Sequence, residues 1–143
     1  MVVDTSAIVA LARNETKAAE VAAALISERN PVIAAPTATA CLIVLNSRFG
    51  PRGRTVYERI RAEFNIGVGP YTEDHVVVAL QAFTRFGKGR HAAGLNFGDC
   101  MTYAAAHVSG EPLLAVGDDF PQTDLEFDGR VLGQWPVYGR GSH

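Results

Sequence analysis

Blocks of apolar residues separated by polar turns divide the chain into alternating short strands and helices. Short apolar runs predict buried strands, and apolar residues at three- and four-residue steps predict helices. Thr5 or Ser6 is the expected N-cap of the first helix, and the sequence GPRGR at 50–54 is expected to end the third. The expected helices span 4–13, 15–29, 37–49, 55–65, 73–86 and 95–109, and the expected strands lie at 1–3, 31–36, 66–72 and 111–120.

This alternation predicts one α/β domain. Strands that alternate with helices are typical of a mainly parallel sheet covered on both faces. The helix at 37–49 is apolar nearly all round, which favours a buried or interface position. The 143 residues suit one core, and neither an internal repeat nor a linker is visible. We assign 1–136 to the domain and interpret 137–143, which ends in GRGSH, as a flexible tail or cloning remnant.

The composition indicates an ordinary globular protein of the cytoplasm. It is 48% hydrophobic and 20% charged, with no apolar stretch long enough to span a bilayer. The N-terminus lacks the basic and apolar segments of a signal peptide. Cys41 and Cys100 form no CxxC pair, which disfavours a zinc site. We expect two buried thiols in a reducing compartment, with a structural disulfide as the alternative.

Positive charges gather in two stretches that contain no Asp or Glu. The net charge of -2 argues weakly against nucleic-acid binding, but 30–57 and 75–98 contain no acid. The basic residues there include Arg48, Arg52 and Arg54 in the first stretch and Arg85, Lys88, Arg90 and His91 in the second. This separation of charges predicts a cationic rim around an anionic pocket.

The acids stand beside strand ends and helix starts. Asp4 and the pair Asp118–Asp119 follow expected strands, and Asp99 begins an expected helix. In an open parallel sheet, sites form at the carboxyl ends of the strands, so one fold could bring these acids together. Several carboxylates in one pocket repel each other unless a cation compensates them. Oxygen ligands without thiolate or imidazole suit Mg²⁺ or Mn²⁺, which activate water for phosphoryl displacement.

Each acid also has a structural interpretation. Asp4 alone could be the N-cap of a helix, and Asp99 could serve the dipole of the helix that it begins. The sequence GDDF at 117–120 could be a turn. The spacing of the acids therefore makes shared metal binding a hypothesis.

Four motifs resemble the PIN-domain ribonucleases, and more narrowly the VapC toxins of bacterial toxin–antitoxin pairs. They are VVDTSAIVAL, FGKGRHAAGLN, GLNFGDCMTYAAA and PLLAVGDDFPQTD, in that order along the chain. The resemblance implies an α/β/α sandwich with a mainly parallel sheet, and metal-dependent endonucleolytic cleavage of RNA such as tRNA or rRNA. It also implies a homodimer and a VapB-like antitoxin, whose C-terminal segment covers the cleft, often placing an Arg against the acids.

The resemblance assigns the site residues by position. Asp4, Asp99 and Asp119 correspond to the ligands of Mg²⁺, with Mn²⁺ as an alternative, and Asp118 is the neighbour of the last; the sequence leaves open which of that pair faces the metal. Thr5 and Ser6 are candidates to hydrogen-bond to ligand carboxylates or metal-bound water, with helix capping as the alternative, and Asp124 is a candidate for an outer position.

One acid of the family pattern is missing. Counting back from Arg48, the usual glutamate falls on Ala40, and neither Thr39 nor Cys41 is a good Mg²⁺ ligand. Two explanations are open. Ala40 is either an engineered replacement that silences a toxic nuclease, which we favour, or the product of natural divergence into a weak or inactive member.

The basic loop before Asp99 is the candidate RNA contact. Arg85, Lys88, Arg90 and His91 would offset phosphate repulsion near an acidic pocket and position an RNA backbone. The alternative is a solvated loop. No RNP-like aromatic motif is present, so the sequence gives no indication of which bases are recognised.

Two other function classes compete with the nuclease. The first is a catalytically inert PIN-like module that binds RNA or protein, in which the acids are structural. The second is a receiver or haloacid-type phosphatase, which is disfavoured because Ser6 breaks a DxD motif at Asp4 and no phosphate-binding Lys follows a late strand. A dinucleotide-binding protein is disfavoured because no GxGxxG follows the first strand.

Overall fold

A parallel four-stranded sheet forms the centre of the protein in a computed structural model, which describes residues 1–124. The strands lie in the order β3-β2-β1-β4, and every pair is parallel. The strands are β1 (Val2–Val3), β2 (Val32–Ala34), β3 (Gly67–Gly69) and β4 (Leu113–Leu114). Val3 and Ile33 of the two central strands are fully buried, as expected where helices cover both faces. The predicted mainly parallel sheet is confirmed.

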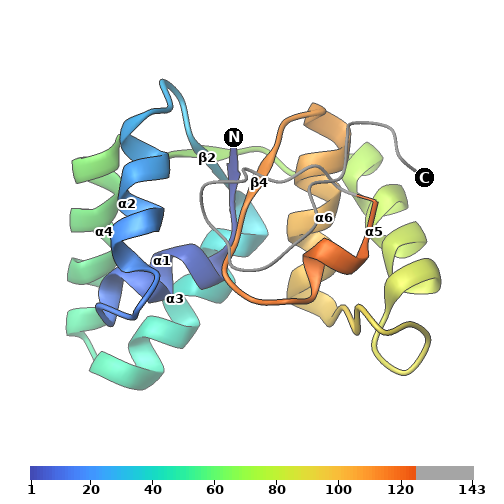
Figure 1. The fold of residues 1–143 in the computed structure, drawn as a ribbon, viewed down its shortest axis with the longest axis horizontal. Helices are drawn as coiled ribbons and strands as arrows, with labels where there is room; N and C mark the ends of the chain where they lie inside the picture. Colours follow the sequence, from blue (N-terminus) through green and yellow to red (C-terminus); the bar gives the residue numbers. More distant parts are fainter. Residues whose placement is uncertain (125–143) are drawn as a thin grey trace.

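Helices pack on both sides of this sheet. Figure 1 shows α2 and α4 on one side of the strands and α5 and α6 on the other. The bounds are α1 (Thr5–Ala12), α2 (Ala18–Ile26), α3 (Ala35–Phe49), α4 (Arg52–Phe64), α5 (Glu73–Phe86) and α6 (Phe97–Ser109), with a 3₁₀ turn η1 (Phe120–Gln122). The predicted α/β/α sandwich is therefore confirmed.

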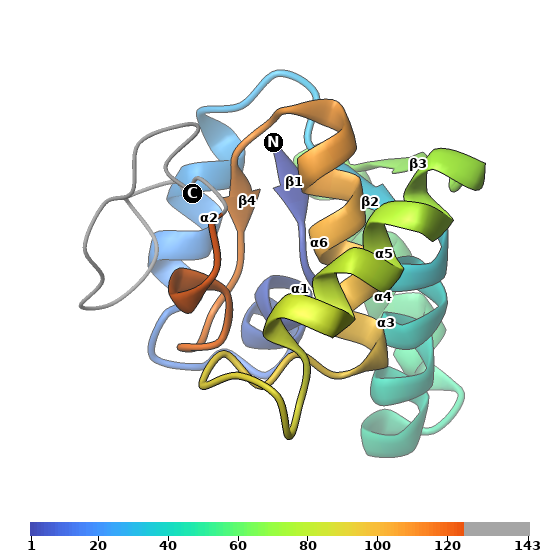
Figure 2. The same ribbon diagram turned by 90° about the vertical axis from the view of Figure 1, so that its right-hand side faces the viewer.

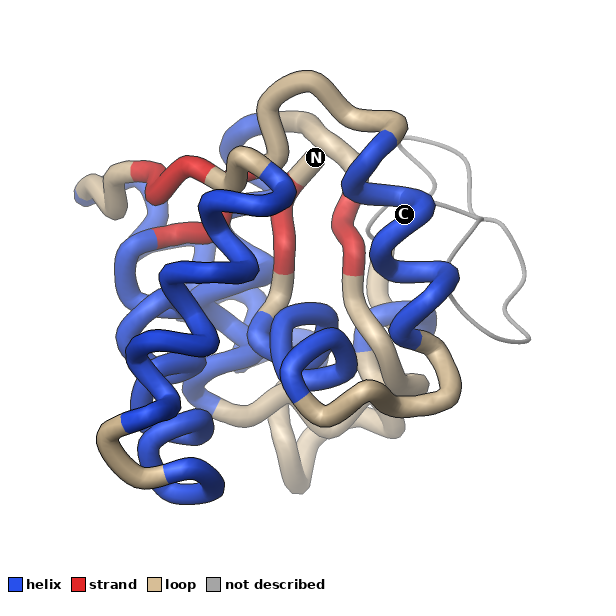
Figure 3. Tube along the Cα trace, turned by 90° about the vertical axis from the view of Figure 1, so that its left-hand side faces the viewer, coloured by secondary structure: helices blue, strands red, loops and turns tan. Residues whose placement is uncertain are grey.

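Several segments meet at the end of the molecule where β1 and β4 finish. Figure 2 shows β1 leading into α1 there, β4 continuing to η1, and the loop after α5 reaching the same end. Figure 3 shows the strands as short segments among longer helices, so the turns that follow them contribute much of this end. The carboxyl ends of parallel strands are where α/β folds build their sites.

The α3–α4 connection is tighter than the sequence predicts. We expected GPRGR to be a loop, but only Gly50 and Pro51 separate the two helices. Gly50 has a φ of 63°, which glycine adopts at little cost. Gly53 lies inside α4, where an added Cβ would come within 2.5 Å of the Leu45 backbone. The absence of a side chain at Gly53 thus allows α3 and α4 to approach closely, and α4 begins before Gly53 rather than after it.

Other element ends also differ from expectation. The N-cap of α1 is Asp4 rather than Thr5 or Ser6, because its carboxylate accepts the Ser6 backbone N–H. The helix expected at 15–29 is shorter, and the Ser27 hydroxyl bonds to the Ala24 carbonyl where α2 ends. The bounds of α5 agree with the prediction.

The remaining sequence expectations have mixed outcomes. Cys41 and Cys100 are buried free thiols, so the disulfide alternative is wrong. None of the helices in residues 1–124 is long and apolar enough to cross a membrane. The expected domain boundary at 136 and the tail at 137–143 lie outside the described residues.

Candidate active site

Asp4 is a buried carboxylate with defined partners on both oxygens. Only 6% of the residue is exposed. Its Oδ2 accepts from the Ser6 backbone N–H at 3.0 Å and from the Ser6 hydroxyl at 2.7 Å, and its Oδ1 accepts from the Thr102 hydroxyl at 2.7 Å. Helix capping and membership of a site, the two interpretations of Asp4, are thus compatible. Because each carboxylate oxygen offers about two lone-pair sites, these bonds fill Oδ2, and Oδ1 keeps one site for a further ligand.

Ser6 connects Asp4 to the segment that follows β4. The Ser6 hydroxyl donates to Asp4 and accepts from the Val116 backbone N–H at 2.9 Å. Val116 stands three residues before Asp119 in the chain. One hydroxyl therefore ties the first acid to the segment that carries the last, and the predicted contact of Ser6 with a site carboxylate is present.

Asp99 takes part in the N-terminal capping box of α6 and also interacts electrostatically with other acids. Its Oδ2 accepts from the Asn96 backbone N–H at 3.1 Å, while Asn96 Oδ1 accepts from the Asp99 N–H at 2.8 Å. This is a reciprocal capping box. Burial raises the pKa of Asp99 to about 6, helped by the negative charges of Asp4 and Asp119 and opposed by the Asn96 hydrogen bond. Asp99 therefore belongs both to the helix N-terminus and to the acidic cluster.

Asp119 is the member of the late acid pair that acts on the site. Burial raises its pKa, and the charges of Asp118 and Asp4 raise it further. Asp119 also raises the pKa of Asp99, whereas Asp118 is not among the causes of that shift. The Asp118 carbonyl accepts from the Gln122 side chain at 3.0 Å. Both acids are exposed, and Asp119 is the one whose charge is coupled to Asp4 and Asp99.

The three acids match a hard divalent cation in donor chemistry. Asp4, Asp99 and Asp119 come from three separate segments, and each is coupled to another through its charge. Within residues 1–124, no three His, Cys, Asp or Glu side chains are gathered closely enough to hold a metal ion. The oxygen donors and their mutual repulsion are the features that Mg²⁺ or Mn²⁺ would satisfy.

Ala40 lies on α3, one turn after the buried Thr37, and is partly exposed. The next residue, Cys41, is fully buried. Burial raises the pKa of the Cys41 thiol to about 12, and the charge of Asp4 raises it further. This part of α3 therefore lies within electrostatic reach of Asp4. Because Cys41 stays protonated near neutral pH, it offers no thiolate in place of a carboxylate at Ala40.

The basic loop is partly committed to contacts within the protein. Lys88 and Arg90 are exposed, and the Arg90 guanidinium lies 5.4 Å from the ring centroid of Phe83. His91 Nδ1 accepts from the Ala93 N–H at 3.0 Å, so its second nitrogen is the one left for other contacts. Lys88 and Arg90 are thus the side chains of this loop that are best placed to contact RNA.

Arg85, predicted for the RNA surface, and Asp124, predicted for an outer position of the site, contact each other. Arg85 Nη1 donates to Asp124 Oδ2 at 3.3 Å, and the Tyr103 hydroxyl donates to Asp124 Oδ1 at 2.5 Å. The Asp124 carboxylate therefore ties the chain after η1 to α5 and α6. Thr5 likewise donates to the Thr37 carbonyl, at 3.4 Å, and not to a carboxylate.

Sequence reasoning missed Thr102 and Thr37 as partners of the site. Thr102 stands one helical turn after Asp99, which places both on one face of α6. Both threonines are buried, at 0% and 2% exposed. A hydroxyl in an otherwise apolar helix was the available signal, because buried polar groups require partners.

Comparison with known proteins gives the family. The PIN domain family model matches residues 1–126. The chain is 57% identical to VapC ribonuclease Mb2004c of Mycobacterium bovis and to ribonuclease VapC36 of Mycobacterium tuberculosis, with 95% of this chain and 98% of each relative covered. A crystal structure of Mycobacterium tuberculosis VapC20, a sarcin–ricin loop cleaving toxin, shares the fold with a TM-score of 0.67 at 22% identity, covering 83% of this chain and 91% of that one. The chain therefore belongs to the PIN-domain family and, within it, to the VapC ribonucleases.

Proposed function

We propose that this protein is an endoribonuclease toxin that hydrolyses RNA phosphodiesters at Asp4, Asp99 and Asp119, with Mg²⁺ or Mn²⁺ as cofactor. The observation that carries the assignment is the coupling of three carboxylates from distant segments around a buried, hydrogen-bonded Asp4. When bound, the cation supplies an activated water and stabilises negative charge on the phosphate. Ser6 and Thr102 hold Asp4 in place, and Asp99 and Asp119 complete the set of oxygen donors.

Ala40 weakens this site in our proposal. A glutamate at Ala40 would add an oxygen donor on α3, near the cluster in which the charge of Asp4 already reaches Cys41. Loss of one such group commonly lowers the rate on the order of 10²-fold or more. We therefore expect slow cleavage by this chain and faster cleavage by its Ala40→Glu variant.

The direct experiment compares RNA cleavage by this chain and by Ala40→Glu, with Mg²⁺ or Mn²⁺ present. Asp4→Asn in the Ala40→Glu background is the negative control, because it removes a carboxylate while keeping the shape of the side chain. Equal rates for this chain and Ala40→Glu would contradict the assigned role of position 40. Unchanged cleavage in Asp4→Asn would contradict the site itself.

The specific observation that favours the inert alternative is Ala40. A PIN-like RNA- or protein-binding module would need no fourth acid. The inert alternative predicts no measurable Mn²⁺ affinity even after Ala40→Glu. Calorimetry of this chain and of Ala40→Glu therefore distinguishes the two functions.

The proposed substrate is a structured cytoplasmic RNA, such as tRNA or rRNA. Lys88 and Arg90 are exposed on the loop after α5, which reaches the same end of the molecule as β1 and β4 (Figure 2). Cations there would hold the RNA backbone against an acidic centre. The relative VapC20 is described as cleaving the sarcin–ricin loop, which makes rRNA a natural first substrate to test.

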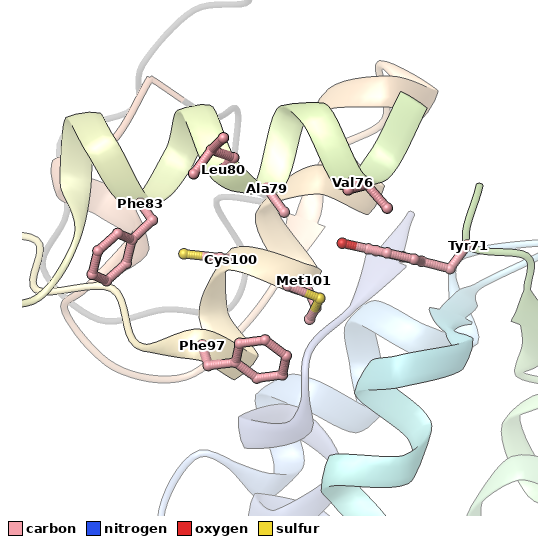
Figure 4. A pocket seen from close by; sticks show the side chains of 8 residues that line it. All are labelled: Tyr71, Val76, Ala79, Leu80, Phe83, Phe97, Cys100 and Met101. Carbon is pink, nitrogen blue, oxygen red and sulfur yellow. The ribbon is translucent and has the colours of Figure 1, made fainter. Parts of the chain in front are cut away.

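Two protein partners complete the proposal: a VapB-like antitoxin, in keeping with the family, and a second copy of this chain. An apolar groove of about 530 Å³ lies between α5 and α6. Figure 4 shows Leu80 and Phe83 of α5 and Phe97 of α6 around it. Phe97 is 79% exposed and Leu80 is 65% exposed, which is costly in water and typical of a binding surface. The lining contains no Asp, Glu, Lys or Arg, which suits an apolar self-association.

A further inference from the structure

Two buried threonines from different helices form a chain of hydrogen bonds that ends on Asp4. Thr102 of α6 places its hydroxyl oxygen 2.7 Å from Asp4 Oδ1. Thr37 of α3 places its hydroxyl oxygen 3.1 Å from that of Thr102. The two residues are 65 positions apart in the sequence and are almost fully buried. α1, α3 and α6 are therefore joined at one carboxylate.

The direction of this chain of hydrogen bonds follows from the number of protons. A threonine hydroxyl has one proton, and an ionised carboxylate only accepts. Thr102 uses its proton on Asp4, so in the second bond Thr37 is the donor and Thr102 the acceptor. The hydroxyls thus point one way, from Thr37 through Thr102 to Asp4. Such a series strengthens each of its bonds in a low-dielectric interior.

The two ends of the Asp4 carboxylate are held by different segments. Thr102 holds Oδ1 from α6, and Ser6 holds Oδ2 from α1 while also bonding to Val116 after β4. A carboxylate fixed at both oxygens cannot rotate freely, and Oδ1, which accepts from Thr102, keeps a lone pair for another ligand. Hydrogen bonds of this kind orient metal ligands and tune their affinity.

We infer that Thr102, supported by Thr37, is a positioning residue for Asp4, and that this hydroxyl relay sets the divalent-cation affinity of the site. The inference rests on the proposed metal-dependent function and deepens it. Because Thr102 also satisfies the buried Oδ1 of Asp4, a purely structural role would lower stability without changing the cation affinity of the folded protein.

The test measures Mn²⁺ binding by calorimetry in the Ala40→Glu background, with folding checked by circular dichroism. Thr102→Val should weaken Mn²⁺ binding about tenfold, and Thr102→Ser should restore it because serine keeps the hydroxyl. Thr37→Val should weaken binding less, because it removes only the outer donor. Thr39→Val is the matched control: Thr39 lies two residues from Thr37, is exposed, and bonds only to the Ala35 carbonyl of its own helix.

The outcomes separate the relay from the metal site. Unchanged Mn²⁺ affinity in Thr102→Val, with loss of binding in Asp4→Asn, would overturn the relay and leave the proposed function intact. Unchanged affinity in Asp4→Asn would overturn the proposed metal site itself. If Thr102→Val does not fold, Thr37→Val decides: weaker binding supports the relay, and affinity equal to Thr39→Val overturns it.

Discussion

At Asp4, capping a helix and building a site use the same geometry. A residue between the end of a strand and the start of a helix has extended backbone, and its side chain turns back toward the first helical N–H groups. In a parallel sheet that position also lies at the edge where sites form. The cap fills part of the acceptor capacity of the Asp4 carboxylate and leaves the rest. The choice between a structural and a functional interpretation is therefore not exclusive for this residue.

Asp99 makes the stability of the protein depend on pH. The ordinary pKa of its carboxyl is 3.8, and burial raises it to about 6 in the folded state. Between these values the folded protein binds the proton more tightly than the unfolded chain does, so this contribution to stability falls as pH rises from about 4 to 6. In EDTA, Asp99→Asn should therefore raise Tm more at pH 7.5 than at pH 4. Differential scanning calorimetry across this range measures the effect.

The control for Asp99 is Asp74→Asn, which changes an exposed acid in the first turn of α5. The change in Tm caused by Asp74→Asn should stay nearly constant between pH 4 and 7.5, whereas the change caused by Asp99→Asn should increase. Parallel curves for the two variants would show that the charge of Asp99 is not penalised in the folded state.

At the scale of elements, α6 organises three separate parts of the chain. Its first turn carries Asp99, and its second carries Thr102, which bonds to Asp4. The next residue, Tyr103, bonds to Asp124 beyond η1. Because these side chains leave one rigid helix, their relative positions are fixed by helical geometry. The segment with Asp119 is held at its start by the Val116–Ser6 bond and after η1 by Asp124.

Tyr103→Phe should test the anchor at Asp124. The substitution keeps the ring that packs against Phe86 and removes the hydroxyl that donates to a carboxylate whose side chain is 7% exposed. A hydrogen bond to a charged group contributes about 1.5–3 kcal/mol, and Arg85 still contacts Asp124, so a loss of about 1–2 kcal/mol is expected. Urea denaturation provides the measurement.

Tyr71→Phe is the matched control, because the Tyr71 hydroxyl donates to the His75 carbonyl at a weaker 3.4 Å. It should change the free energy of unfolding less than Tyr103→Phe does. Equal losses in the two variants would argue against a specific anchor at Asp124.

The loop after α5 should supply part of the affinity for RNA backbone. Lys88→Ala with Arg90→Ala should weaken binding and make it less sensitive to salt, because fewer counterions are released. Each lost phosphate contact lowers the slope of log affinity against log salt by about 1. Fluorescence anisotropy with a labelled RNA at several salt concentrations measures this slope.

Arg29→Ala with Arg59→Ala removes the same net charge from exposed positions elsewhere, before β2 and on α4. This control should leave the salt slope closer to that of the parent. A slope unchanged by the loop substitutions would remove the loop from the proposed RNA surface.

At the scale of the whole molecule, the two sides of the sheet differ in what they expose. On one side, several apolar side chains of α5 and α6 line an open groove (Figure 4). On the other side lies α2 (Figure 1), where Ile26 is an exposed apolar side chain outside this groove. The groove adjoins the site in sequence, since Phe97 precedes Asp99 by two residues. Association through this groove would place a second copy close to the start of α6.

Leu80→Asp should convert the proposed homodimer to a monomer, because it puts a charge into an apolar surface that must be dehydrated. Sedimentation velocity of the purified chain measures the outcome. Ile26→Asp is the control, with an exposed isoleucine on α2 replaced by the same charge. A dimer that survives Leu80→Asp, or one lost equally in Ile26→Asp, would contradict the assignment of the groove.

Chain order and the hydrophobic pattern were enough to predict the order of strands and helices and the residue types of the candidate site. Alternating apolar runs predicted the parallel α/β fold, and strong local signals placed α5, where Thr72 caps the start and Gly87 ends the helix. Local signals failed where packing decided, as in α4, which begins early because Gly53 fits against α3. Acids at strand ends were visible because their positions follow from chain order.

Which side chains meet became visible only once the helices were packed across the sheet. The Thr37–Thr102–Asp4 relay joins positions up to 98 residues apart, and no periodicity encodes such a contact. The same is true of Asp124, which pairs with Tyr103 and Arg85. Chain order and hydrophobic period fix local geometry, whereas these pairings depend on how whole helices pack across the sheet. That packing placed Asp119 within electrostatic reach of Asp99 and brought two threonines to Asp4.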